Sequence, residues 1–497
     1  MSSFLNLCSC EFTKIRKKKS TKIMMIILVL SVFVAVLLSI LTKEIYNVSE
    51  TYYSNADYKT MEKTEMEALK AELENYESSL DVSSKNTIKA KIDTYQMAID
   101  YDINIYNNYW KNNVLMNDIL ISKVQYYDYK SIEDEELANI EDQNINKKLE
   151  LIKNDDFDGY MNTQKDILKA NYEANLMSKE EYDIATNILD IRTKYKIGKE
   201  YNPEDSWKET IIEEIEVLSN NIRYGVDTVT QKALSEKDVE KAKDSIKMNE
   251  YRLEHNMPPY ATATTIGNTR KIFDYVVGGT TLLALSVMII IIAGSSISSE
   301  ISKGTIKFWS FTPNKRWKVL LSKLVVTVII LILASVVMSI ISTIVGNVFF
   351  GSENAQGYIY VKNGAVHEIN YLAYIIIYNL LSSIEVFMFL LFAMMLSTVT
   401  RNTAISVGVS IATYLGGSTI MSIVNSLVNS EWVKFIPSNN LSIAERVFSN
   451  DITYSASTVL EPLANNSSVS FSLILLGVCA LIMIVTMFDS YRKRDII

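Results

Sequence analysis

The sequence has very few of the residues that build disulfides and metal sites. Its three cysteines among 497 residues are Cys8, Cys10 and Cys479. The long polar segment 42–272 therefore contains none, and its elements must be held together by packing. The two histidines, His255 and His367, lie far apart and have no cysteine or acidic pattern beside them that suits a metal ion. We expect no resident metal.

A phosphate-binding loop is also missing. The pattern G-x-x-x-x-G-K-[ST], whose backbone amides hold the phosphates of ATP, occurs nowhere in the chain. Acidic pairs such as Asp155-Asp156 stand in stretches typical of solvated helices and loops. We therefore expect a chain that is not an enzyme and binds no cofactor of its own.

Apolar residues gather in long runs instead of being spread through the chain. A helix needs roughly 20 apolar residues to cross the hydrocarbon core of a bilayer. The runs of about that length are Ile23–Leu41, Tyr275–Ala293, Val319–Val345, Tyr371–Leu396, Ala404–Leu427 and Val469–Met487. The sequence therefore predicts an all-α membrane protein with six transmembrane helices.

The first run follows a basic segment, as the core of a signal peptide does. It is longer than such a core, however, and it ends in Leu41-Thr42-Lys43-Glu44 with no small-x-small cleavage site. We interpret 1–22 as a cytoplasmic segment and 23–41 as a retained first transmembrane helix.

The basic residues predict how the chain crosses the membrane, because loops rich in Lys and Arg stay in the cytoplasm. Such residues dominate the N-terminal segment, the connection after the second run, and the C-terminal tail. These segments fall on one side if the chain crosses six times, so both termini are predicted to be cytoplasmic. The segment 42–272 is then extracellular. The remainder, 273–497, forms a five-helix membrane domain with a cytoplasmic loop at 295–318 and an extracellular loop at 428–468.

The predicted extracellular domain has apolar residues at helical spacing, for example Met66, Leu69 and Leu73. Strand patterns are scarce in it, which predicts a helical domain. It also has a clear excess of Asp and Glu over Lys and Arg. That charge can attract cationic peptides, although an acidic surface is more commonly a solvated one.

The predicted cytoplasmic loop 295–318 has the most informative pattern. Glu300 opens it, Gly304 permits a sharp bend, and Pro313 restarts the chain before the third run. The apolar residues within Ile306–Trp309 indicate a short amphipathic helix beneath the membrane. A basic loop that only sets the orientation of the protein would not need this order of residues.

This loop resembles that of the permease subunits of type-2 ABC transporters, in which an acid is followed by G-T-hydrophobic-K, then P, R and S-K. The matching residues are Glu300, Gly304, Thr305, Lys307, Pro313, Arg316, Ser322 and Lys323. Further likenesses are the segments 11–16, 396–397, 401–402 and 494–496. One helix, a large outer domain and then five helices is a layout similar to a subset of this family. The resemblance covers the membrane half and hardly reaches the outer domain.

The resemblance implies that this loop contains a coupling helix, which docks on a separate cytoplasmic ABC ATPase subunit. ATP and Mg²⁺ would belong to that partner. The residues implied at the interface are Glu11, Lys14, Glu300, Gly304, Thr305, Lys307, Pro313 and Arg316. It further implies a bacterial plasma membrane protein that works in export, together with a second copy or a related permease.

The substrate is not specified by any residue pattern. We expect an amphiphile such as an antimicrobial peptide, a lipid or a drug, and small ions remain open because sodium-export permeases have a comparable layout. The expected surroundings are the lipid bilayer and no nucleic acid. The alternative function is a surface receptor or immunity membrane protein, whose extracellular domain binds a ligand without transport.

Glu385 lies in the middle of the fourth run, where a charged side chain costs at least a few kcal/mol unless it faces a polar interior. We expect it to point into the helix bundle. There it either lines the substrate route or pairs with a polar group such as Asn379 or Ser383. The alternative is a protonated structural carboxyl bonded between helices.

Overall fold

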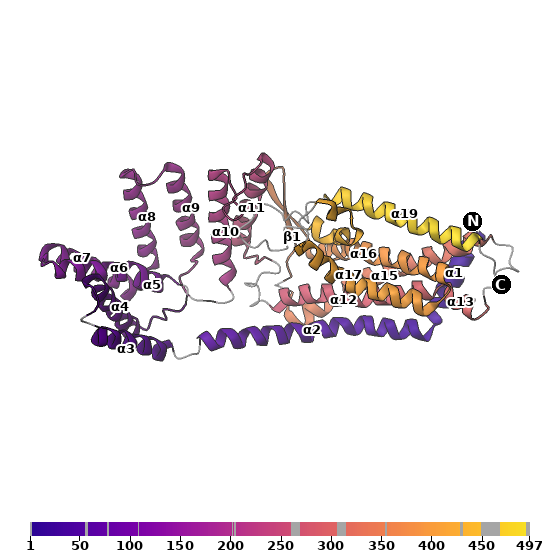
Figure 1. Cartoon of the computed structure of the whole chain (residues 1–497), viewed down its shortest axis with the longest axis horizontal. Coiled ribbons are helices and arrows are strands. Elements are labelled where there is room, and N and C mark those ends of the chain that lie inside the picture. Colours follow the sequence, from indigo (N-terminus) through magenta and orange to yellow (C-terminus); the bar gives the residue numbers. More distant parts are fainter. Residues whose placement is uncertain are drawn as a thin grey trace. The chain divides into compact units, whose positions relative to one another are not determined.

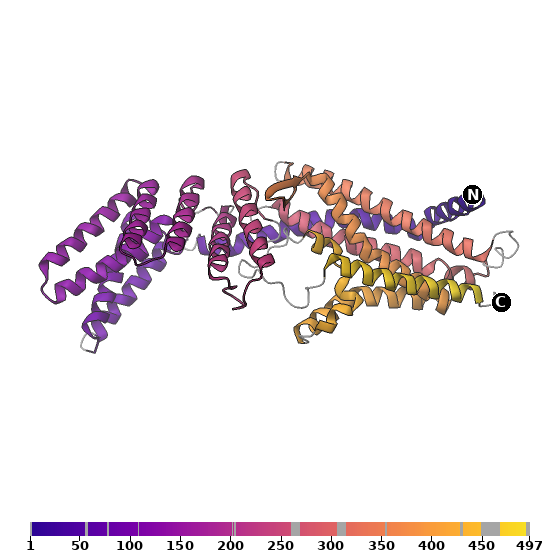
Figure 2. The same cartoon turned by 90° about the horizontal axis from the view of Figure 1, so that it is seen from above.

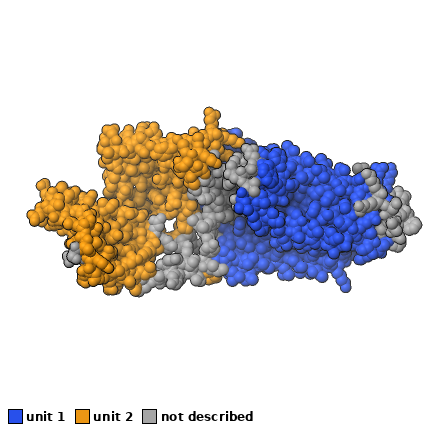
Figure 3. Space-filling view, viewed as in Figure 1, with its two compact units in different colours: residues 1–42, 259–497 blue, residues 43–258 orange. Residues whose placement is uncertain are grey.

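The structure is a computed structural model, which describes residues 2–54, 58–76, 79–107, 109–200, 202, 205–259, 269–305, 315–352, 355–427, 431–448 and 468–493. The chain divides into two compact units, coloured separately in Figure 3. Unit 1 comprises 1–42 and 259–497, and unit 2 comprises 43–258.

Unit 1 is built around long apolar helices, and six helices in the described part of the chain can span a membrane by length and composition. They are α2 (Lys19–Ser54, apolar over Lys19–Glu44), α12 (Thr269–Ser295), α15 (Arg316–Phe350), α16 (Tyr371–Thr400), α17 (Thr403–Leu427) and α19 (Val469–Lys493). Each contains one of the apolar runs, so the prediction of an all-α protein with six transmembrane helices is confirmed. α12, α15, α16, α17 and α19 lie alongside one another in Figures 1 and 2.

Helix α16 is the centre of this bundle, since it packs against α12, α15, α17 and α19. Its residues Val386, Leu390 and Met394 are fully buried in the main apolar core. Close approach also requires a small residue on α12: a Cβ on Gly294 would lie 2.8 Å from Cγ2 of Val407 on α17. Small residues at such crossings let helix backbones approach within a membrane.

A polar seam joins α15 and α16 inside the bundle. The hydroxyls of Ser335 and Ser383 are 2.6 Å apart, and the side-chain amide of Asn379 donates to Ser339 Oγ at 2.9 Å. Bonds of this kind between membrane helices satisfy polar groups that lipid cannot. The seam therefore fixes which faces of α15 and α16 meet.

A second polar cluster joins α12, α15 and α16 near the start of α12. The guanidinium of Arg270, which is 1% exposed, donates to Asp274 Oδ1 at 3.1 Å and to Tyr371 Oη at 2.8 Å. It also donates to Asn347 Oδ1 at 2.8 Å and to the backbone oxygen of Gly351 at 3.0 Å. One buried cation thus holds the ends of three helices together.

A hairpin between α15 and α16 is the one two-stranded sheet in the described residues. Strands β1 (Tyr358–Lys362) and β2 (Ala365–Ile369) pair antiparallel, with Lys362 opposite Ala365. Asn363 and Gly364 form the turn with φ of 54° and 77°, as a two-residue hairpin turn requires. This hairpin was not predicted from the sequence.

Short helices follow α17 and pack into the bundle. They are η4 (Glu431–Phe435), η5 (Pro437–Asn440) and α18 (Ile443–Val447). The buried Asn440 accepts a hydrogen bond from Ser472 Oγ of α19 at 2.7 Å. Ile443 packs with Met388 of α16 and Leu476 of α19. This segment is therefore anchored to two of the long helices.

The regular elements of unit 2 are helices in its described residues, apart from an isolated bridge between Val226 and Ala233. Its elements are α3 (Tyr58–Tyr76), α4 (Val82–Tyr101), α5 (Trp110–Asn113), the π-helix η1 (Val114–Ile119), α6 (Leu120–Ser131), α7 (Glu135–Lys153), α8 (Phe157–Glu173), α9 (Lys179–Tyr195), α10 (Ser206–Tyr224) and α11 (Glu236–His255). They enclose two apolar cores, one around Trp110 and Phe157 and one around Trp207 and Ile212.

Local sequence explains where helices of unit 2 begin. Ser178 and Ser235 each accept a hydrogen bond from the backbone three residues later, and Glu181 and Asp238 bond back to them. These capping boxes satisfy backbone N–H groups that have no partner within the helix.

Glu62 is an exception to the apolar packing of unit 2. The residue is fully buried, and its Oε1 accepts from the backbone N–H of Ile105 at 3.2 Å. Its Oε2 is buried without a hydrogen-bond partner among the described residues. Burial raises the pKa of Glu62, and the charge of Asp102 raises it further. The folded state therefore favours the protonated carboxyl more than the unfolded chain does.

Because the pKa of Glu62 is higher in the folded state than in the unfolded chain, ionisation of Glu62 destabilises unit 2 when the pH rises above the usual pKa of a glutamate. The effect vanishes in acid, where the carboxyl is protonated in both states. We expect Glu62→Gln to increase the free energy of unfolding by roughly 1–2 kcal/mol at pH 8 and to change it little at pH 4. Urea unfolding of the purified full chain, followed by circular dichroism, measures the difference. Glu67→Gln, on an exposed position of the same helix, is the control. An equal shift at both pH values would contradict the assignment.

Candidate functional site

The first helix supplies one side of a buried ionic site. α1 (Ser2–Lys17) packs against α15. Leu7, Glu11 and Ile15, spaced four apart, are buried along one face, whereas Phe12 is exposed. The helix ends at Lys17 and α2 begins at Lys19. Glu11 thus points into unit 1 with its apolar neighbours.

The second side comes from α13 (Ser298–Ser302), a short helix that follows α12. Its start is fixed to neighbouring helices: the backbone N–H of Ser298 donates to Ser397 Oγ at 3.0 Å, and its hydroxyl lies 2.8 Å from Thr403 Oγ1. Ser406 Oγ donates to the backbone oxygen of Gly294 at 2.9 Å. These contacts hold Glu300 in a defined place.

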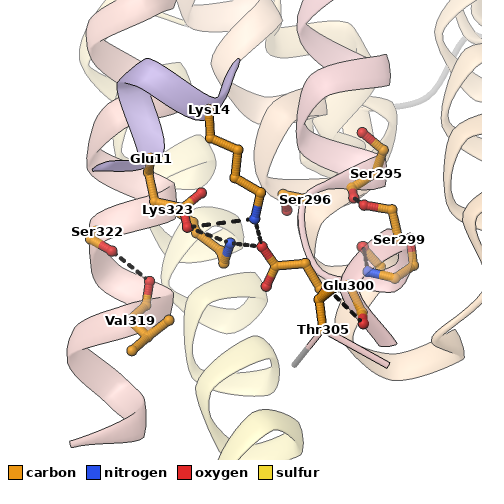
Figure 4. Close-up of polar contacts among 12 residues, drawn as sticks. Glu11, Lys14, Ser295, Ser296, Ser299, Glu300, Thr305, Val319, Ser322 and Lys323 are labelled. Carbon is orange, nitrogen blue, oxygen red and sulfur yellow. Dashed lines mark hydrogen bonds and ion pairs between the residues drawn. The ribbon is translucent and has the colours of Figure 1, made fainter. Parts of the chain in front are cut away.

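Lys323, two turns into α15, lies between the two carboxylates. Its Nζ is 2.9 Å from Glu11 Oε1 and 2.7 Å from Glu300 Oε1. Lys14 of α1 also pairs with Glu300 and lies 3.9 Å from Glu11. Figure 4 shows the two lysines converging on Glu300 from α1 and α15. We call Glu11, Lys14, Glu300 and Lys323 the four-residue ion cluster.

Three members of the ion cluster are removed from solvent. Glu11, Glu300 and Lys323 are 4%, 3% and 3% exposed, whereas the side chain of Lys14 is 42% exposed. Buried charges must be paired, because the loss of hydration costs several kcal/mol per ion. Each carboxylate here faces at least one ammonium, so the buried charges on α1, α13 and α15 are paired with one another.

Titration of the groups follows from this geometry. Burial opposes the ionisation of Glu300, but the charge of Lys323 and the hydrogen bond from Lys14 outweigh it and hold the pKa of Glu300 below its usual range. Burial lowers the pKa of the nearby Lys18, and the charges of Lys14 and Lys323 lower it further. Glu300 is therefore an anion that neutralises crowded ammonium groups.

The chain leaves the ion cluster through an exposed turn. Gly304 has φ of 68°, a left-handed conformation that glycine adopts without strain, and a Cβ there would meet open space. Thr305 is exposed, and its hydroxyl donates to the backbone oxygen of Glu300 at 3.3 Å. Arg316 begins α15 and is exposed. These residues provide a surface directly beside the buried charges.

The structure thus brings together some of the residues that the sequence predicted as a partner interface. Glu11, Lys14 and Glu300 meet although nearly 300 residues separate them in the chain. The carboxylates of Glu11 and Glu300 face inward, and their direct contact with a partner stays a prediction. Lys307 and Pro313 lie outside the described residues. Lys323 was not among the predicted site residues, although its place in the S-K pair of the matched loop was a signal for it.

Glu385 lies on α16 away from the ion cluster, and the partners that we suggested for it are bonded elsewhere. Asn379 donates to Ser339, and Ser383 donates to the backbone oxygen of Asn379 at 2.7 Å. No described residue forms a hydrogen bond or an ion pair with Glu385. The suggested bond from Asn379 or Ser383 to Glu385 is therefore wrong, because both side chains serve the α15–α16 seam.

Comparison with known proteins gives one family. The family described as "ABC-2 family transporter protein" matches residues 5–496. The chain is similar to "Uncharacterized protein YhcI" of Bacillus subtilis (strain 168), with 30% identity over 258 residues, 51% of this chain and 76% of that protein. It is also similar to "Uncharacterized membrane protein YdbK" of the same organism, with 29% identity over 216 residues, 43% of this chain and 78% of that protein. No solved structure gives a significant match.

Removal of the central ammonium tests the ion cluster. Lys323→Met leaves Glu11 and Glu300 buried with less compensating charge, so we expect a loss of roughly 3–5 kcal/mol in stability. The temperature at which half of the detergent-purified protein leaves its size-exclusion peak should fall by several degrees. Lys323→Arg, which keeps the charge, should lose much less.

A second variant separates charge from packing. Adding Glu11→Gln and Glu300→Gln to Lys323→Met removes the unpaired anions and should recover much of the lost stability. If the single and triple variants are equally unstable, the aliphatic stem of Lys323 matters and the charges do not.

Proposed function

This chain belongs to the ABC-2 transporter family, and we propose that it is the membrane permease of an ATP-driven export complex. The single observation that carries the proposal is the ion cluster, because it connects an N-terminal helix, the start of a loop and a membrane helix through buried charges. Since one ammonium serves two carboxylates, displacement of α13 also displaces α15 or breaks the cluster.

The partner in this proposal is a separate ABC ATPase. The chain has no phosphate-binding loop, so ATP and Mg²⁺ would be held by that partner. The docking surface would consist of the exposed turn and the loop that follows it, with Gly304, Thr305, Lys307, Pro313 and Arg316. Glu11 and Glu300, buried behind this surface, would hold it in position. The partly exposed Lys14 would lie beside the surface and add to the contact with the partner.

The end of unit 1 that carries α1 would then face the cytoplasm of a bacterial cell. This orientation agrees with the basic residues around α1 and at the start of α15. Unit 2 would lie outside the cell. The exposed apolar residues of α17, including Ile405, Val409 and Ile420, suit contact with lipid or with a second permease.

The proposed cargo is an amphiphile that is moved out of the cell. A permease that accepts cargo from lipid needs an apolar route bounded by membrane helices. Unit 1 offers apolar surface along α16, α17 and α19 and no cluster of metal-ligating residues among those described. An amphiphilic peptide, lipid or drug fits such a route better than a hydrated ion does.

Purification of the tagged full chain from its native host in mild detergent tests the partner. We expect an ABC ATPase to co-purify in stoichiometric amount. Arg316→Glu, at the proposed docking surface, should lower its recovery by about tenfold or more. Lys179→Glu makes the same charge change on unit 2, where the side chain is 72% exposed, and should have no effect.

The readouts are mass spectrometry of the co-purified proteins and ATP hydrolysis by the eluted complex. A chain that elutes alone and without ATP hydrolysis would contradict the permease proposal and favour a receptor or immunity protein. Equal loss of the ATPase in both variants would place the contact elsewhere.

A further inference from the structure

A cavity of about 310 Å³ lies in unit 1 where α16, α17 and α19 meet the short helices after α17. Its walls are Met388, Phe389, Phe392, Thr413, Pro437, Ser438, Leu441, Cys479, Ile482 and Met483. The volume falls at the lower end of the roughly 300–1,000 Å³ usual for small-molecule sites. Two aromatic rings and several sulfur-bearing side chains give walls that adapt to apolar ligands.

Glu385 lies on the same stripe of α16 as the residues that line this cavity. Met388 and Phe389 follow it by three and four residues, and Phe392 by seven, so these side chains share one face of the helix. The Phe389 ring packs edge-to-face on Tyr414 of α17, with centroids 5.1 Å apart.

A second carboxylate, Glu445, lies on α18, which packs against α16. Ile443, two residues before Glu445, packs on Met388 and Leu476. The apolar cavity therefore has a carboxylate on the helix that forms one wall and another on the short helix packed beside that wall.

The nearby cations are engaged elsewhere. Arg446 donates to the backbone oxygen of Asn439, and Lys434 lies over the ring of Phe435. Glu385 has no hydrogen bond or ion pair within the described part of the chain, although its side chain is only partly exposed. A carboxylate in this position is costly, and a bound cation would offset its desolvation.

We propose that this cavity binds an amphiphilic organic cation, whose apolar body fills the space and whose charge pairs with Glu385. Phe389 and Phe392 line the same space, and aromatic side chains there favour a cation with aromatic or aliphatic substituents. Because it names a cargo, this proposal rests on the proposed export function. The binding site itself requires no ATPase, and this allows the two proposals to be tested separately.

The test uses two probes of nearly equal size and opposite charge, tetraphenylphosphonium and tetraphenylborate. The full chain is placed in phosphatidylcholine nanodiscs without an ATPase, and binding is measured by equilibrium dialysis against empty nanodiscs of the same lipid. We expect saturable binding of the cation above the lipid background and none of the anion. Equal binding of both probes, or of neither, would overturn the proposal.

Two variants locate the binding. Glu385→Gln keeps the shape and removes the charge, and it should weaken binding of the cation by at least about tenfold. Glu368→Gln, on the exposed face of β2, removes a carboxylate from the hairpin and should bind as the wild type does. Met483→Trp fills the cavity and should abolish binding with Glu385 intact. Wild-type affinity in either Glu385→Gln or Met483→Trp, in protein that elutes normally from a size-exclusion column, would overturn the site.

The outcomes also separate this inference from the transport function. If an ATPase co-purifies but no cation binds, the permease proposal stands and this cavity is not its cargo site. If the cation binds as described but no ATPase is found, the site stands and the export function falls.

Discussion

A buried ammonium shared by two carboxylates is the constraint on which the α1 end of the protein depends. Lys323 contacts Glu11 and Glu300 at 2.9 Å and 2.7 Å, and none of the three is well hydrated. Burial of any one charge alone would be strongly unfavourable. The three elements that carry them must therefore assemble together, which makes the position of α13 depend on α1 although they are remote in sequence. The exposed turn at Gly304 and Thr305, which follows α13, is therefore positioned by the same ion cluster.

The membrane helices show how polar groups are distributed through an apolar bundle. Helix α12 carries Arg270 and Asp274 near its start and leads into Glu300 just after its end, and both sets of charges are buried among partners. Between them the helix is apolar and packs on α16. Dispersion forces hold the middle of the helix, whereas directional bonds, and the close approach at Gly294 near the last turn, define its ends. The two ends of α12 therefore have specific partners, and its middle is held by apolar packing.

Much of the fold could be predicted because it is encoded locally. Apolar runs set the membrane helices, and Ser178 and Ser235 set helix starts in unit 2. Contacts between residues that lie far apart in the sequence could not be predicted in this way. Nothing near Asn379 in the sequence indicates that its partner is Ser339 rather than Glu385, because that choice depends on how α15 and α16 face each other. Lys323 was visible only as part of a family motif, and its role as the centre of the ion cluster required the folded chain. The Asn363-Gly364 turn was a local signal that we missed between two membrane helices.

The serine pair in the α15–α16 seam bears on how easily these helices can part. Ser335 and Ser383 each also have a backbone oxygen of their own helix within reach, those of Leu331 at 2.9 Å and Asn379 at 2.7 Å. When the helices touch, one hydroxyl can turn toward the other; when they separate, it can return to its own helix without leaving a donor unsatisfied. The serine contact therefore costs little to break, unlike an interhelical ion pair, whose separation would leave unpaired charges in lipid.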